Sequence, residues 1–359
     1  MKGGLDTLVL RLTNRCNLAC GYCYAGSGPA GEDLSPERAA EAVALACPPG
    51  GALRIQFTGG EPLLRWDTAV KVLDFGRASG RRFHAAIQTN GTLLTPALCR
   101  ELRARRVAVG VSLDNAARRT PEGEPSFQAT ARGLQTLAAA GMAANLTAVV
   151  SAGSVRGLDR LLDFALWCGN VHGVGLDLVR PQGRGAGAGL SPSPQALAEG
   201  LNRLLARHDQ LARLGRPVRL KELERLRLLL RTGCRRDCYC NAQTGRSLAV
   251  MPDGRLWPCS ALAGAEGCLL GTLGAGTALP QSPCPGLEPP EECARCPAFG
   301  LCGGGCPAAR RAGPSPLDCQ MHRRMLEHAC RLEGKLEWWN TWKTAFPDRE
   351  EPDDKEESQ

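Results

Sequence analysis

Three cysteines near the N-terminus have a spacing that suits a metal centre. Cys16, Cys20 and Cys23 lie within eight residues, directly after a predicted strand. No further cysteine or histidine follows until Cys47, whereas a structural zinc site takes four protein ligands. On a 4Fe–4S cluster, three cysteines leave one iron open to an exogenous ligand. We therefore predict an iron–sulfur cluster that takes part in chemistry, with zinc as the alternative.

A second group of cysteines lies in the C-terminal part of the chain. Twelve of the eighteen cysteines fall between Cys234 and Cys330, among many turn residues, so we expect this region to be ordered largely by metal. Zinc is again the alternative, because Cys-x2-Cys pairs also build zinc ribbons. We expect ordinary buried or surface thiols at the cysteines without a partner spacing: Cys47, Cys99, Cys168, Cys268, Cys284 and Cys330.

The composition places the chain among globular proteins of ordinary size. Of its 359 residues, 43% are hydrophobic and 22% are charged, and no apolar run approaches the roughly 18 to 20 residues that cross a bilayer. The N-terminus lacks the apolar core and cleavage site of a secretory signal. We expect a cytoplasmic protein with reduced thiols and no membrane partner.

The basic charge is concentrated in one stretch. Residues 203–236 hold eleven Arg and Lys against three acids, which equals the net charge of +8 of the whole chain. Aromatic residues make up only 4% of the sequence and do not interleave with this charge, so we expect no nucleic-acid partner. We expect a solvated helical face. The alternative is that Arg213, Arg216 and Arg219 attract an acidic peptide toward the mouth of the barrel.

Short β-rich runs alternate with helical stretches over the first half of the chain. The predicted strands cover residues 7–12, 53–57, 83–87, 107–111, 145–150 and 174–179. Six strand–helix units imply a parallel sheet, and they are two short of a closed eight-unit barrel. We predict an α/β fold with a partial (β/α)6 barrel, in which ligands gather at the carboxyl ends of the strands.

Changes in composition along the chain suggest its domains. The first part is the partial barrel, a Gly/Pro/Ser-rich linker and bridging helices follow, and a cysteine-rich domain, an aromatic helix and an acidic disordered tail complete the chain. These parts are expected at residues 1–180, 181–233, 234–330, 331–346 and 347–359.

The first cysteine motif resembles the signature of the radical S-adenosylmethionine (SAM) enzymes, Cys-x3-Cys-x2-Cys on the loop after the first strand. An aromatic residue, Tyr22, precedes the last cysteine, as in that family. The resemblance implies that the open iron binds S-adenosylmethionine. It also implies that the reduced cluster cleaves this cofactor to methionine and a 5′-deoxyadenosyl radical, which takes a hydrogen atom from the substrate.

Loops after the next strands extend the resemblance. Gly59-Gly60-Glu61 is similar to the family's Gly-Gly-Glu motif, which binds the methionine amino group; glycines permit a close backbone approach and a carboxylate accepts from an ammonium. Arg118 resembles an arginine that contacts the methionine carboxylate, with Arg119 as the alternative. The resemblance implies these cofactor-binding residues: Tyr22, Gly59, Gly60, Glu61, Asn90, Ser112 and Arg118. It identifies no catalytic acid or base.

The C-terminal cysteines resemble those of the SPASM domain, which holds two auxiliary 4Fe–4S clusters in many peptide-modifying radical SAM enzymes. The resemblance implies three clusters in all, one of which binds S-adenosylmethionine. The implied ligands of the nearer auxiliary cluster are Cys234, Cys240, Cys259 and Cys306, with Cys238 as the alternative to Cys234. Those of the farther cluster are Cys293, Cys296, Cys302 and Cys319.

The resemblance implies maturation of a ribosomally synthesised peptide by an oxidative crosslink or a related modification. An external electron donor would reduce the clusters, and a separate leader-recognition protein or direct docking would supply specificity. Sulfatase maturation is an alternative, although an aspartate typically follows the cysteine equivalent to Cys259 in those enzymes, and this chain has Ser260. Tetrapyrrole modification and a non-enzymatic iron–sulfur scaffold or regulator are further alternatives.

Overall fold

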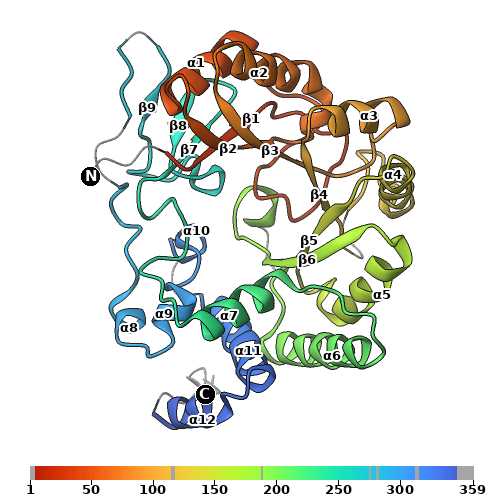
Figure 1. Ribbon diagram of the computed structural model, residues 1–359, viewed down its shortest axis with the longest axis vertical. Helices are drawn as coiled ribbons and strands as arrows, with labels where there is room; N and C mark the ends of the chain where they lie inside the picture. Colours follow the sequence, from red (N-terminus) through yellow and green to blue (C-terminus); the bar gives the residue numbers. More distant parts are fainter. Residues whose placement is uncertain are drawn as a thin grey trace, which may run out of the picture.

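Six parallel strands and the helices between them form the first half of the molecule. The computed structural model describes residues 5–114, 118–186, 189–274, 276–279, 283–311 and 315–345. The strands are β1 (Thr7–Arg11), β2 (Ala52–Thr58), β3 (Arg82–Thr89), β4 (Ala108–Ser112), β5 (Ala144–Val150) and β6 (Val171–Leu178). The helices on the outer side of the curved sheet are α1 (Pro36–Ala46), α2 (Trp66–Ala78), α3 (Pro96–Ala104), α4 (Phe127–Ala139) and α5 (Leu158–Cys168) (Figure 1). The predicted α/β class and partial barrel are confirmed.

Local sequence explains where these elements begin and which face they bury. Helix α1 begins after Ser35, whose hydroxyl accepts from the Arg38 N–H, and Pro36 occupies its first position. Burial alternates along the strands, so one face of the sheet, which carries Leu8, Leu10 and Phe57, is fully buried.

The sheet does not end with the barrel. Strand β7 (Ser247–Val250) pairs in parallel with β1, with Thr7 opposite Ser247, and β8 (Arg255–Trp257) and β9 (Gly271–Thr272) follow in antiparallel pairing. The strand order is β6-β5-β4-β3-β2-β1-β7-β8-β9. The sequence analysis did not predict these three short strands. They attach the cysteine-rich region directly to the first strand of the barrel.

The other edge of the sheet is closed by the bridging helices α6 (Pro194–Arg213) and α7 (Lys221–Thr232). The Val174 N–H donates to the Arg219 carbonyl at 2.8 Å, and the Leu176 N–H donates to Glu222 Oε1 at 3.2 Å. Burial raises the pKa of Glu222 to about 7. Because these groups occupy edge amides of β6, the open barrel offers less free strand edge for pairing with another chain.

The turn between α6 and α7 lies beside the start of β6. Arg213, Arg216 and Arg219 are exposed, and Arg219 lines a surface hollow together with Val171 and His172, the first residues of that strand. The loops with the expected cofactor residues follow the opposite, carboxyl ends of the strands. This position favours the expected solvated face over the alternative that these three arginines attract a peptide toward the barrel mouth.

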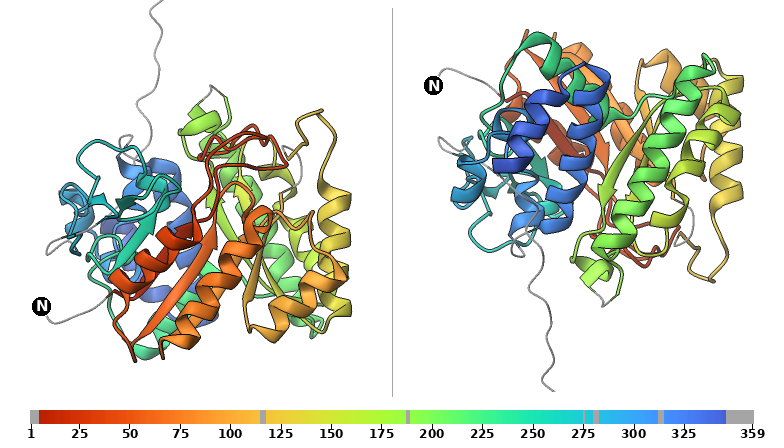
Figure 2. Two further views of the ribbon diagram at one scale, coloured as in Figure 1. Left: turned by 90° about the horizontal axis from the view of Figure 1, so that it is seen from above. Right: turned by 90° about the horizontal axis from the view of Figure 1, so that it is seen from below.

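The C-terminal helices pack across the bridging helices. Helix α11 (Pro316–Leu332) lies against α6 and α7, and α12 (Leu336–Ala345) lies against α11 (Figure 2). Trp339 is buried, whereas Trp338 is 39% exposed. The short helices α8 (Glu291–Ala294), α9 (Phe299–Cys302) and α10 (Pro307–Arg310) complete the cysteine-rich region. The predicted acidic tail lies outside the described residues, and no described helix is long and apolar enough to cross a membrane.

Two buried histidines meet where α6 packs on α11. His208 and His328 are each 5% exposed, and Nε2 of His328 lies 3.1 Å from Asp209 Oδ1. Arg331 forms an ion pair with Asp209 and donates to His328 Nδ1 at 2.8 Å. Burial lowers the pKa of His328 to about 4 and also lowers that of His208.

We predict that this pair makes the fold sensitive to acid. Between about pH 6.5 and pH 4 the unfolded chain binds a proton at His328 that the folded chain does not bind, so the free energy of unfolding falls as the pH falls through this range, by at most about 3 kcal/mol. His328→Gln should therefore lose less Tm than the parent protein between pH 7 and pH 5. His84→Gln, at an exposed position, is the control and should follow the parent; identical curves for all three proteins would contradict the prediction.

Candidate functional site

The three N-terminal cysteines lie on one long loop after β1. The Leu34 N–H donates to the Leu12 carbonyl at 2.9 Å and closes the loop, and the Cys16 N–H donates to the Gly28 carbonyl at 2.6 Å. Burial raises the pKa of the Cys16 thiol to about 11, and the nearby charges of Glu61, Cys20 and Cys23 act in the same direction. The structure thus brings the three thiols together. Metal binding must displace the Cys16 proton.

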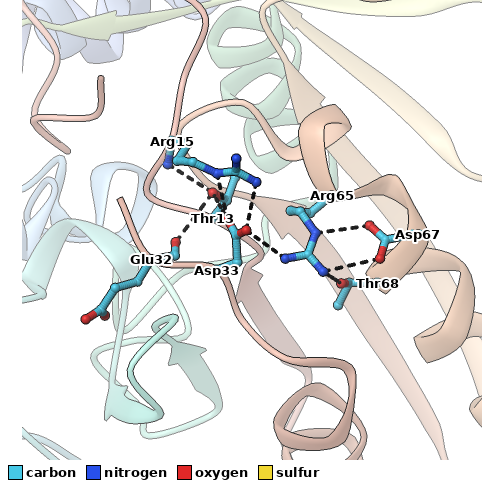
Figure 3. Close-up of polar contacts among 7 residues, drawn as sticks. All are labelled: Thr13, Arg15, Glu32, Asp33, Arg65, Asp67 and Thr68. Atoms are coloured by element: carbon cyan, nitrogen blue, oxygen red, sulfur yellow. Dashed lines mark hydrogen bonds and ion pairs between the residues drawn. The ribbon is translucent and has the colours of Figure 1, made fainter. Parts of the chain in front are cut away.

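Ion pairs fix the base of this loop (Figure 3). Asp33 accepts from Thr13 Oγ1 and Arg15 Nε, and both Arg15 Nη2 and Arg65 Nη1 reach its other carboxylate oxygen, at 2.7 and 2.8 Å. Arg65 also pairs with Asp67 in the first turn of α2 at 3.1 Å. Although burial alone raises the pKa of Asp33, these hydrogen bonds lower it overall. The loop is therefore anchored to the start of α2 as well as to the sheet.

The two glycines after β2 touch the cysteine loop directly. A Cβ on Gly59 would lie 2.6 Å from the Thr13 carbonyl oxygen, and one on Gly60 would lie 2.1 Å from the Arg15 carbonyl oxygen. The Gly60 N–H donates to Thr13 and the Glu61 N–H donates to Arg15, each at 2.8 Å. Because any side chain would collide with backbone here, only glycine permits this crossing.

Glu61 joins three loops of the site. Its carboxylate accepts from the Leu63 N–H at 3.1 Å, from the Thr89 hydroxyl at 2.7 Å and from the Asn90 N–H at 2.7 Å. The side chain is fully buried, and burial raises its pKa despite these bonds. Most of its acceptor capacity is therefore used within the protein. Glu61 thus holds the three loops together, in addition to its expected contact with the cofactor.

The residues expected after β3 and β4 lie around the same loop. The Asn90 amide donates to Asn17 Oδ1 at 2.8 Å and lies 3.9 Å from Cys16 Sγ. Ser112 accepts from Gln88 at 2.9 Å. Arg118 is 5% exposed and donates to the Asn90 carbonyl at 2.9 Å and to the Ser112 carbonyl. The structure gathers these residues at one end of the sheet.

Arg118 and Arg119 lie in different surroundings. The Arg118 guanidinium lowers the otherwise raised pKa of Cys20, both by its charge and by a hydrogen bond. Arg119 is exposed and donates to the Gly123 carbonyl at 2.9 Å. The Tyr22 hydroxyl donates to Asp114, and burial raises its pKa. Of the two arginines, Arg118 is the one that faces the cysteines.

The C-terminal cysteines fall into two groups. In the first, burial raises the pKa of Cys259, and the charges of Cys306 and Cys240 add to it. The pKa of Cys240 is likewise raised by burial and by Cys306 and Cys238. Cys234 is exposed after α7. Cys234 and Cys238 remain the two predicted alternatives for the fourth ligand of this group.

The second group contains the four remaining spaced cysteines. Burial raises the pKa of Cys302 to about 11, and Cys319 and Cys293 contribute. Burial raises the pKa of Cys293, and the charges of Cys319 and Cys296 raise it further, while the charge of Arg310 lowers it. The fold thus places together the four cysteines expected for the farther cluster.

The structure also reveals contacts that sequence reasoning missed. Cys284 Sγ lies 3.2 Å from Cys268 Sγ, and both thiols are buried. Part of the expected linker forms η3 (Gly183–Ala186) and packs on the cysteine loop: Arg184 Nε donates to the Cys20 carbonyl at 2.8 Å. A Cβ on Gly183 would lie 2.5 Å from the carbonyl oxygens of Cys23 and Tyr24. The Gly-Arg-Gly sequence at residues 183–185 was the one feature of the sequence that could have indicated this close packing.

The donor chemistry fits iron–sulfur clusters. All three groups are built from cysteine, whose sulfur can bind metal, and thiolates are the ligands that 4Fe–4S clusters take. The first group offers three thiols, which leaves one iron open, whereas each of the other two offers four. Cys16, Cys20 and Cys23 would hold the cluster that binds a cofactor. The two C-terminal groups would hold fully ligated clusters.

Comparisons with known proteins agree with this geometry. The Radical SAM superfamily model matches residues 10–158. An uncharacterized protein of Methanocaldococcus jannaschii is 29% identical over 272 residues, which cover 74% of this chain and 88% of that protein. The serine-type anaerobic sulfatase-maturating enzyme of Klebsiella aerogenes is 27% identical over 366 residues, with 92% and 87% covered.

Solved structures share the fold over nearly the whole chain. The structure of native anSMEcpe with bound AdoMet and Cp18Cys peptide has a TM-score of 0.77 at 20% identity and covers 94% of this chain and 100% of its own. Streptococcus suis SuiB bound to precursor peptide SuiA has a TM-score of 0.60 at 15% identity, with 87% and 74% covered. Residues 10–158 therefore match the Radical SAM superfamily, and the chain shares its overall fold with these solved structures.

Proposed function

We propose that this protein is a radical SAM maturase that modifies a ribosomally synthesised peptide. The observation that carries the proposal is the buried junction at Glu61, which fixes the cysteine loop against the ends of β2 and β3. When bound, the cluster and S-adenosylmethionine would supply a 5′-deoxyadenosyl radical that takes hydrogen from the peptide. The product would carry an oxidative crosslink or a related modification.

The protein's own part in this reaction is to bind and orient. Cys16, Cys20 and Cys23 would hold the cluster, and the Arg118 guanidinium beside Cys20 would receive the carboxylate of the cofactor. Asn90 and Ser112, both tied to neighbouring side chains, would face the nucleoside. Because Glu61, Asn90 and Arg118 are all buried, the site excludes water and favours strong polar contacts.

A peptide substrate is supported by the solved structures of similar fold that hold peptides. The eight C-terminal cysteines that fall into two groups support two auxiliary clusters, which would pass electrons to and from an external donor. Sulfatase maturation remains a second candidate, because the Klebsiella relative aligns with 92% of this chain. Ser260, which follows Cys259 in place of an aspartate, favours the first candidate.

We predict that each cysteine group loads independently. After anaerobic reconstitution the protein should contain about twelve irons, and replacing Cys16, Cys20 and Cys23 with alanine should remove about four of them. The same variant should release no 5′-deoxyadenosine from S-adenosylmethionine and dithionite. Iron and sulfide analysis and chromatography measure both results.

The matched control replaces three cysteines outside the groups, Cys47, Cys99 and Cys168, with alanine. This control should keep all iron and all cofactor cleavage. Zinc in place of iron in the unmodified protein, or cleavage that persists without the N-terminal cysteines, would contradict the proposal.

We predict that Glu61→Ala weakens both the fold and cofactor binding. The change leaves the N–H groups of Leu63 and Asn90 and the Thr89 hydroxyl without their acceptor, at about 1–3 kcal/mol for each buried donor. Tm should fall, and the affinity for S-adenosylmethionine should fall by about tenfold or more. Glu101→Ala removes an exposed acceptor of Trp66 and should change neither value. Unchanged cofactor affinity in folded Glu61→Ala would remove Glu61 from the site.

The substrate class is tested with peptides. With S-adenosylmethionine and dithionite, a peptide encoded beside the gene should lose two hydrogen atoms, which mass spectrometry detects. A serine peptide from a sulfatase is the comparison. If only that peptide changes, sulfatase maturation is the function; if 5′-deoxyadenosine forms while no peptide of either kind changes, a peptide substrate is excluded.

A further inference from the structure

Arg180 connects the end of the barrel to the C-terminal cysteines. It lies two residues after β6, and its Nη1 donates to the Sγ of Cys306 at 3.1 Å. Its charge also acts on Cys259, the thiol on the loop after β8. Both cysteines belong to the first C-terminal group. One guanidinium therefore faces two expected ligands of the nearer auxiliary cluster.

The backbone around Arg180 is held in place from two sides. The Gln182 N–H donates to the Arg180 carbonyl at 2.8 Å, and the Arg184 N–H donates to the Cys23 carbonyl at 3.0 Å. A Cβ on Gly185 would lie 2.4 Å from the Arg180 carbonyl oxygen. The turn that carries Arg180 is thus packed tightly on the N-terminal cysteine loop while its side chain reaches Cys306.

The chemistry of this contact favours an anionic sulfur. A guanidinium has only donors, and a neutral thiol is a weak acceptor. Removing a guanidinium from water is costly unless an anion accepts from it. A thiolate bound to a cluster meets this need, so the contact agrees with Cys306 as a cluster ligand.

We propose that Arg180 raises the reduction potential of the auxiliary cluster held by Cys240, Cys259 and Cys306. Reduction adds one electron and one negative charge to the cluster, and no bond forms or breaks. A fixed positive charge that donates to a ligand sulfur stabilises the reduced form more than the oxidised form. This inference rests on the proposed function, in which that cluster accepts electrons. Arg180 acts through Cys306 and is a tuning residue, not a catalytic one.

The test is a redox titration with dithionite, followed by electron paramagnetic resonance. The protein carries Cys16→Ala, Cys20→Ala and Cys23→Ala, so that only the auxiliary clusters titrate. Arg180→Met should make reduction of one cluster about tenfold less favourable, a shift of about 59 mV to lower potential for one electron, and leave the other cluster unchanged. Arg180→Lys, which keeps the charge without the planar fork, should shift the potential less.

Arg225→Met is the matched control. Arg225 lies in the same region and donates to the Tyr239 carbonyl at 3.0 Å, not to a sulfur. Arg225→Met therefore removes one positive charge without removing a hydrogen bond to a cysteine. An equal shift in this variant would mean that net charge, not the hydrogen bond to Cys306, sets the potential, and it would overturn the inference.

The remaining outcomes separate this inference from the proposed function. Arg180→Met with full iron content and the parent potential overturns the inference alone. If that variant loses a cluster, Arg180→Lys tests the inference instead. A loaded cluster with a lower reduction potential than in the parent protein supports the inference. An unchanged potential, or loss of the cluster, overturns it. If the parent protein shows no auxiliary cluster signals, the proposed electron path fails with it.

Discussion

The contact between the glycines after β2 and the cysteine loop is the constraint on which the site depends. The Gly60 backbone passes so close to the Arg15 carbonyl that a single added carbon would lie 2.1 Å from it. This approach brings Glu61 close to Cys16, where its carboxylate accepts from donors at the end of β3. The loop that carries Cys16, Cys20 and Cys23 therefore takes its shape from the two neighbouring strands, because its own sequence has little regular structure.

Positive charge surrounds the sulfurs in a consistent way. Arg118 acts on Cys20, Arg180 donates to Cys306, and Arg310 lowers the raised pKa of Cys293. Each cysteine group thus has at least one guanidinium close to it. Thiolates buried together repel one another, and a cluster adds charge when it is reduced, so these arginines offset a cost that burial alone would impose. The geometry suits anionic centres better than neutral thiols.

The C-terminal region is an extension of the barrel sheet. Because β7 pairs with β1, the strand that leads into the N-terminal cysteines also supports the strand pair that leads to Cys259. The turn at Arg180 and η3 adds a second link between the two regions. Two independent connections fix the C-terminal cysteines relative to the N-terminal loop, as the proposed electron transfer between clusters requires.

Residue spacing and hydrophobic pattern predicted the kind of site and most of the barrel. Cysteine spacing is a local property, so Cys16, Cys20 and Cys23 could be recognised as one group, and alternating apolar runs predicted all six barrel strands. What the sequence could not decide depends on contacts between distant segments. Strands β7 to β9 are only two to four residues long, too short for a pattern. The burial of Arg118 beside Cys20 and the reach of Arg180 to Cys306 follow from how loops pack. Tertiary structure decided these because a side chain's partner is set by the approach of backbones far apart in the chain, and no local spacing encodes that approach.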